Sequence, residues 1–236
     1  MKSRCPYCNK DLGKEIKRKI ACPSCGKTIY VRHGNPVTER EKEIFDWQLY
    51  MDFLVPDINE IRNSVEKRLT ERFRKQSSAS DLVWGMFNHI ITKLRKPDDL
   101  SLLYQNMATF LESEGKHQQA DNLKRESLKA SIVGFRDSSF EHIIKIRNKE
   151  DGFVCEVCKK LNGKAFTLDE GTKEPPVPVL GCQNKMCRCW ADFVMKDEGE
   201  SNNENTDREI VITIKREENE NKSSGGFFRN LFKGKK

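Results

Sequence analysis

The sequence predicts a mainly α-helical fold, in which a helical bundle is flanked by two small cysteine-rich β-type modules. Nine cysteines fall into two groups near the ends of the chain, and the 129 residues between Cys25 and Cys155 contain none. Apolar residues in that middle region recur every three or four positions, which is the helical period. Charged residues make up 33% of the chain and its mean hydropathy is -0.75, so several small units are favoured over one thick core.

Composition and cysteine positions divide the chain into five segments. The predicted order is a cysteine-rich module, a helical bundle, a second cysteine-rich module, an acidic linker, and a short strand followed by a basic amphipathic tail. The corresponding ranges are 1–36, 37–148, 149–195, 196–209 and 210–236.

The first module contains two Cys-x-x-Cys motifs separated by thirteen residues, with cysteines at Cys5, Cys8, Cys22 and Cys25. Each motif presents two sulfurs on one side of a turn, so bringing the turns together supplies the four ligands of a tetrahedral metal ion. This spacing is typical of a zinc ribbon. Residues 2–33 hold too little apolar material to fold alone, so zinc binding and folding are expected to be one event.

Other interpretations of these cysteines are less favoured. Cys5-Pro6-Tyr7-Cys8 has the letters of a glutaredoxin-type redox motif, but such a motif follows a strand and begins a helix, and here a second Cys-x-x-Cys comes instead. Disulfides are disfavoured because no export signal is readable. Iron is a minor competitor of zinc for four thiolates.

The hairpin of the ribbon is basic, which leaves two uses of its surface open. Phosphate contact with a nucleic acid is one, and protein docking or a purely structural role is the other. Tyr7 and Tyr30 suit base stacking and packing equally well. The basic residues of the hairpin are Lys14, Lys17, Arg18, Lys19, Lys27 and Arg32.

The middle region is expected to form five or six helices between about 39 and 148. Thr38 is followed by acidic residues as at a helix start, and Pro97 opens another helix that should close at Gly115. The segment after Pro97 partly matches one tetratricopeptide-like hairpin, but no second copy occurs, so an ordinary antiparallel hairpin is expected. Core packing is the expected role of the tryptophans, which are Trp47, Trp84 and Trp190.

The second module holds five sulfurs, one more than tetrahedral zinc accepts. Cys155 and Cys158 form a Cys-x-x-Cys pair, and two of the later three complete the shell; we expect Cys182 and Cys187. Cys189 either replaces one of them or packs as a buried thiol. A structural metal is expected rather than a catalytic one, because no histidine falls in this segment.

Residues 151–194 resemble the C-terminal zinc-binding module of phage head morphogenesis proteins of the Mu F-like type. The resemblance rests on Cys155, Cys158, Leu161, Gly163, Pro175, Pro176, Cys187, Arg188 and Cys189. The family usually has a histidine where this chain has Asn184, and Cys182 is expected to replace it as a ligand. The resemblance implies phage or prophage ancestry and contact with a portal or the interior of a shell.

The last part of the chain is expected to be a polar linker and a docking tail. Residues 196–209 hold six acids against two bases, and Ile210 to Ile214 is a short β-like run. The last fifteen residues hold five bases and no acid, and their apolar side chains would share one helical face. Such a tail suits an anionic membrane surface or a groove on a partner.

These features together predict a cytoplasmic, non-enzymatic protein that binds two zinc ions and acts as an adaptor for a protein partner. No signal peptide or membrane-spanning run is readable. The formal charge of +7 falls to about +3 when two zinc–thiolate sites are counted, so charge alone does not indicate nucleic acid. A nucleic-acid-binding ribbon protein is the main alternative, and a thiol redox enzyme is a third.

Overall fold

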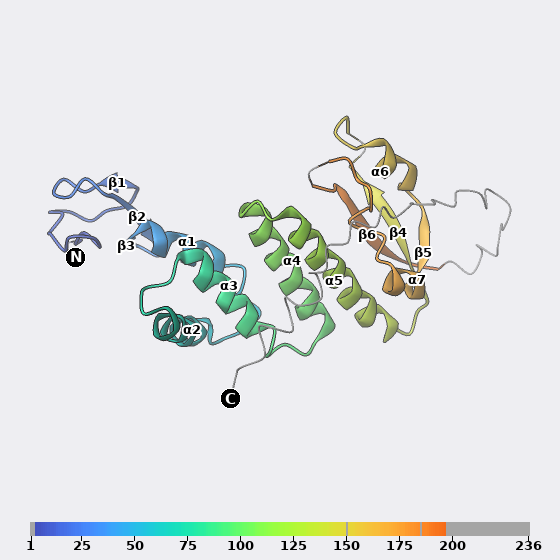
Figure 1. Ribbon diagram of the computed structural model, residues 1–236, viewed down its shortest axis with the longest axis horizontal. Coiled ribbons are helices and arrows are strands. Elements are labelled where there is room, and N and C mark those ends of the chain that lie inside the picture. The colour runs from blue at the N-terminus through green and yellow to red at the C-terminus, as the bar shows by residue number, and fades with distance from the viewer. Residues whose placement is uncertain (1–2, 150, 185, 197–236) are drawn as a thin grey trace. The chain divides into compact units, whose positions relative to one another are not determined.

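The computed structural model describes residues 3–149, 151–184 and 186–196, within which it is mainly helical with two small antiparallel sheets (Figure 1). In chain order the elements are β1 (Ile20–Ala21), β2 (Thr28–Arg32), β3 (Asn35–Val37), α1 (Glu39–Gln48), α2 (Ile58–Phe73), α3 (Ala79–Ile90), α4 (Pro97–Ser113), α5 (His117–Arg136), β4 (His142–Asn148), α6 (Glu156–Leu161), β5 (Ala165–Thr167), α7 (Leu168–Lys173) and β6 (Cys189–Met195). The predicted fold class is confirmed. The linker and tail predicted for 196–236 lie outside the described residues, apart from Lys196.

The first sheet has the strand order β1-β2-β3, and both pairings are antiparallel. Its core cluster is small: within the described residues, the buried members of this cluster are Cys5, Ile16, Cys22 and Ile29. Two of these four are cysteines. A core of this size buries too little apolar surface to stabilise the sheet without further cross-links.

Within the described residues, helices α1 to α4 share the largest core, together with the beginning of α5. Thr38 caps α1, since its hydroxyl accepts a hydrogen bond from the Glu41 amide, and Pro97 stands at the start of α4. Both expected helix starts are confirmed. Helix α3 packs closely on α2 at Gly85, where an added Cβ would lie 2.6 Å from Val65 Cγ1.

Helices α4 and α5 form the antiparallel hairpin expected after Pro97, and they lie side by side in Figure 1. The turn between them uses Gly115 at φ +74°, a left-handed conformation that suits glycine. A hydroxyl network joins the helices, because Ser101 Oγ lies 2.9 Å from Ser127 Oγ and 2.7 Å from Ser131 Oγ.

The second sheet has the order β5-β4-β6, with both neighbours antiparallel to the central strand. Strand β4 lies in the range where only helices were expected, up to 148, so that part of the prediction is wrong. Ile144 and Ile146 are buried on alternate positions, which is the period-two signal of a strand. The core of this module also includes Leu128 and Ile132, so the second half of α5 packs with the sheet.

The three tryptophans do not share one role. Trp47 and Trp84 pack against the helical core, as expected. Trp190 is 43% exposed, so the prediction of core packing is wrong for this residue. Its neighbours Cys189 and Ala191 face the core of the second module, and side chains alternate along a strand, so Trp190 points to the other face of β6.

Candidate metal centres

The first candidate centre is built by two similar turns. The Cys5 carbonyl accepts from the Asn9 amide and the Cys22 carbonyl accepts from the Gly26 amide, each at 2.9 Å. Asn9 and Gly26 have φ of 58° and 70°, the left-handed region that closes such a turn. Each turn then returns as a hairpin, because the Cys5 and Cys22 amides donate to the carbonyls five residues further on. The same local geometry therefore occurs twice.

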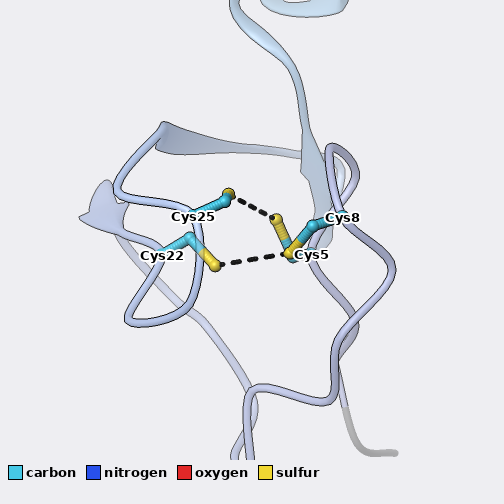
Figure 2. A group of neighbouring side chains, drawn as sticks. All are labelled: Cys5, Cys8, Cys22 and Cys25. Carbon is cyan, nitrogen blue, oxygen red and sulfur yellow. Dashed lines mark hydrogen bonds between the residues drawn. The ribbon is translucent and has the colours of Figure 1, made fainter.

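The two turns bring all four predicted sulfurs together, as Figure 2 shows. Cys5 Sγ lies 3.8 Å from Cys25 Sγ, and Cys8 Sγ lies 3.8 Å from Cys22 Sγ. A tetrahedron with metal–sulfur bonds of about 2.3 Å has edges of about 3.8 Å. All four atoms lie within 4.8 Å of one another, so a single ion fits among them.

Backbone amides around this centre stabilise thiolates. The amides of Cys25 and Ser24 donate to Cys22 and, against the effect of burial, lower the pKa of its thiol to about 6. The Tyr7 amide lies 3.4 Å from Cys5 Sγ as a further donor. Metal ligands must be deprotonated, so these amides prepare the site for a cation.

Contacts that sequence reasoning did not find connect the first centre to helix α1. Tyr7 lies between two ligands, and its phenol oxygen accepts from the Glu39 amide at 2.9 Å. Arg32 makes a two-pronged ion pair with Asp46 of α1, at 2.6 and 3.0 Å. The Tyr30 hydroxyl donates to the Glu39 carboxylate at 3.2 Å.

The same two tyrosines are covered by cations. Lys27 Nζ lies 5.0 Å from the centre of the Tyr7 ring, and Lys19 Nζ lies 5.0 Å from that of Tyr30. Contacts with lysine side chains and with the start of α1 therefore account for the positions of both rings. This arrangement leaves less ring face for base stacking than the sequence suggested.

The second candidate centre takes its sulfurs from three segments. Cys155 and Cys158 stand at the beginning of α6 and are three residues apart, so they lie on one face of the helix. Cys182 lies in the loop after a proline-rich segment, and Cys187 and Cys189 lie at or just before the start of β6. All five predicted cysteines belong to one cluster in the second core.

Within the described residues, these five sulfurs form two overlapping groups of three rather than one group of four. Cys155, Cys158 and Cys182 are one group, and Cys158, Cys187 and Cys189 are the other. Cys158 Sγ is shared, lying 3.5 Å from Cys182 Sγ and 3.9 Å from Cys187 Sγ. Cys155 Sγ lies 3.8 Å from Cys182 Sγ. These spacings suit a metal ion centred near Cys158.

Local surroundings differ among three of the five thiols. Burial raises the pKa of Cys155, but amides of Gln183 and Cys158 outweigh it and lower that pKa to about 7. The Val179 amide donates to Cys187 Sγ at 3.3 Å. Burial, opposed by its contact with Cys158, raises the pKa of Cys189 to about 11.

Asn184 and Arg188 organise the loop beside the second centre. Asn184, which stands where the resemblance expects histidine, donates to the Phe153 carbonyl at 2.6 Å. Arg188 pairs with Asp151 at 2.7 Å and lies over the Phe153 ring. The resemblance did not assign these roles. The described histidines belong to neither centre, and they are His33, His89, His117 and His142.

Comparisons with protein-family models, curated proteins and solved structures find no significant match. None of the described helices combines the length and the apolar character needed to cross a membrane. Within the described chain, the cysteine clusters are thus the chemical feature on which a function can be argued.

Proposed function

We propose that this chain is a zinc-binding, non-enzymatic adaptor that uses two metal-stabilised modules to flank and position a helical protein-binding region. The observation that carries the proposal is the first centre, where four sulfurs from two matching turns lie within 4.8 Å of one another. Zinc is the metal we propose, because a tetrahedral all-sulfur site suits it and its bond length matches the sulfur spacing.

A structural role is proposed for both ions because the donors are thiols from the protein itself. A catalytic zinc site keeps one position for water and has a base nearby. Four thiolates fill the shell of the first ion, and the second cluster has five thiols available. No histidine joins either described cluster, and this favours a structural role of the metal over a hydrolytic one.

The protein-binding surface that we propose is the turn after α1. Leu49, Tyr50 and Phe53 are 56%, 46% and 62% exposed, so three large apolar side chains lie within five residues. Neighbouring exposed apolar side chains of this kind mark contact sites more often than isolated ones do.

We also propose that the second module derives from a phage or prophage head protein, on the motif residues given above.

Metal analysis and partner capture test the proposal together. We expect native mass spectrometry of the chain isolated from its source to show two zinc ions and a bound protein. A Leu49→Ser/Phe53→Ser variant should keep both ions and lose that protein, whereas Leu102→Ser, at another exposed apolar position, should keep it. Absence of zinc, or equal capture by all three chains, would contradict the proposal.

A second candidate function is nucleic-acid binding through the end of α2. Five basic side chains there are exposed and form no ion pair within the described residues. They are Lys67, Arg68, Arg72, Arg74 and Lys75. Phe73 beside them is 50% exposed. Fluorescence anisotropy with a labelled oligonucleotide at about 50 mM and about 200 mM salt distinguishes the two functions, because phosphate contacts weaken steeply with salt. No binding at the lower salt concentration excludes this candidate.

A further inference from the structure

Helix α1 is too short to be ordered by its own backbone hydrogen bonds. It has ten residues, and isolated helices of that length are marginal in water. It packs on the helical core through Ile44, which is fully buried, and it also contacts the first metal module. The order of α1 therefore depends on both neighbours.

The first module supplies a hydrogen-bond acceptor that the beginning of α1 needs. The first amides of a helix have no acceptor within the helix. The Thr38 hydroxyl accepts from the Glu41 amide at 3.1 Å, and the phenol oxygen of Tyr7 accepts from the Glu39 amide at 2.9 Å. Tyr7 stands between the two predicted ligands of the first turn, so the turn that the ion closes also sets the position of this acceptor.

Two further contacts hold the second half of α1. Arg32 at the end of β2 makes the two-pronged pair with Asp46, a geometry that fixes the orientation of both side chains. The ring of His33 meets the ring of Phe45 edge to face, with 5.7 Å between the ring centres. The first module thus contacts α1 near both ends of the helix.

The last residues of α1 support the turn that carries the proposed protein-binding surface, residues 49–54, which we call the docking turn. The amides of Met51 and Asp52 donate to the Gln48 carbonyl at 2.8 and 3.0 Å, and the Tyr50 amide donates to the Trp47 carbonyl at 3.1 Å. The rings of Trp47 and Tyr50 also lie 5.3 Å apart. The arrangement of the docking turn therefore follows from that of α1.

We infer that zinc binding at the first centre regulates the docking turn, because the loaded module orders α1 and α1 orders the turn. This inference rests on the proposed function and adds its regulation. Without the ion, the small core cluster of the module does not keep it folded, and the contacts of Tyr7 and Arg32 with α1 are lost. Helix α1 then keeps only its contacts with the helical core, and the apolar side chains of the docking turn lose their common arrangement.

Hydrogen exchange of the full chain, with one centre emptied at a time, tests this coupling. Cys22→Ser empties the first centre, and we expect the amides of residues 39–54 to exchange about tenfold faster than in the wild type, as loss of a hydrogen bond and an ion pair allows. Cys155→Ser empties the second centre and should leave these amides at the wild-type rate. Helices α3 and α4 serve as the reference, since they should stay protected in both variants.

The exchange data separate the two hypotheses. If Cys22→Ser speeds exchange in β1 to β3 and leaves residues 39–54 at the wild-type rate, the inference is wrong and the proposed zinc binding stands. A wild type whose first centre takes up no zinc in native mass spectrometry refutes the proposed function instead.

A variant that keeps the ligands and breaks the contacts tests the route. Tyr7→Phe/Asp46→Asn should still bind two zinc ions, yet its residues 39–54 should exchange about tenfold faster than in the wild type. The control Tyr30→Phe removes a phenol whose partner is the Glu39 carboxylate rather than the Glu39 amide, so exchange should stay within about twofold of the wild type. Wild-type exchange in the double variant would overturn the inference.

Combining the changes checks that the zinc effect passes through these contacts. Adding Cys22→Ser to Tyr7→Phe/Asp46→Asn should speed exchange in residues 39–54 by less than about twofold, because the contacts that transmit the effect are already absent. A further tenfold increase would show that zinc acts on α1 by another route and would contradict the inference.

Discussion

If the proposed zinc binding holds, single cysteines should decide whether the first module folds, because each ligand closes a metal site in a module whose apolar core is small. Cys22 is both a predicted ligand and one of the four buried members of the core cluster of the first module. We expect Cys22→Ser to lower the zinc content from two ions to one and to unfold residues 3–37, since structural zinc supplies about 10 kcal/mol or more to such a module. Metal analysis and amide exchange measure both effects. Ser24→Ala, in the same turn, is the control and should keep two ions.

His89 makes stability depend on pH near neutrality. Burial, together with Lys93 and Arg68, lowers the pKa of His89, and Asp57 opposes them weakly. The unfolded chain therefore binds a proton more readily, so stability is full above about pH 6.5 and falls as the pH drops from there towards the folded pKa. Thermal melts in excess zinc should show a smaller loss between pH 7 and pH 5 for His89→Gln than for the wild type. An equal loss would contradict this assignment.

At the scale of elements, the contact of α2 with α3 depends on the absence of a side chain at Gly85. A Cβ there would lie 2.6 Å from Val65 Cγ1 and 3.6 Å from Leu69 Cδ1. Overpacking of this kind costs about 1–3 kcal/mol, which exceeds the gain in helix propensity of about 1 kcal/mol. We expect Gly85→Ala to lower the free energy of unfolding in denaturant titrations. Val65→Ala in the same chain should recover part of that loss, and strict additivity of the two changes would argue against the clash.

The ion pair of Arg32 with Asp46 links the first sheet to α1. Arg32 and Lys42 both reach the Asp46 carboxylate, at 2.6 Å each. The side chains are about one third exposed, so we expect Asp46→Asn to cost no more than about 1 kcal/mol. Faster amide exchange in β2 and β3 with unchanged zinc content would show that the pair positions the sheet. Glu126→Gln, which removes an exposed pair with Lys129, should leave that exchange unchanged.

At the scale of the whole molecule, three separate cores predict an uneven response to metal removal. The core shared by helices α1 to α4 contains no cysteine, whereas both other cores contain the predicted ligands. A zinc chelator should abolish amide protection in β1 to β3 and leave α3 and α4 protected. In the second module, Leu128, Ile132, Ile144 and Ile146 supply an apolar core, so protection there should be only partly lost. Uniform loss of protection along the described chain would show that the cores are coupled.

The sequence-based prediction succeeded where a pattern reports directly on local geometry. Repeated Cys-x-x-Cys spacing predicted the turns around Cys5 and Cys22, and helical spacing with Thr38 and Pro97 predicted the helices and two of their starts. It failed at β4, where the alternation of Ile144 and Ile146 spans too few residues to outweigh the helices before it. Trp190 was misplaced because the pattern around it does not show which face of β6 is covered.

By itself, then, the sequence determined the fold class and the grouping of the cysteines, because ligand spacing and helical period act over a few neighbouring residues. Only the tertiary structure decided how the sulfurs of the second centre meet, with Cys158 shared between two groups, and how Tyr7 and Arg32 connect the first module to α1. These contacts join residues distant along the chain, and their geometry depends on packing that no local pattern records.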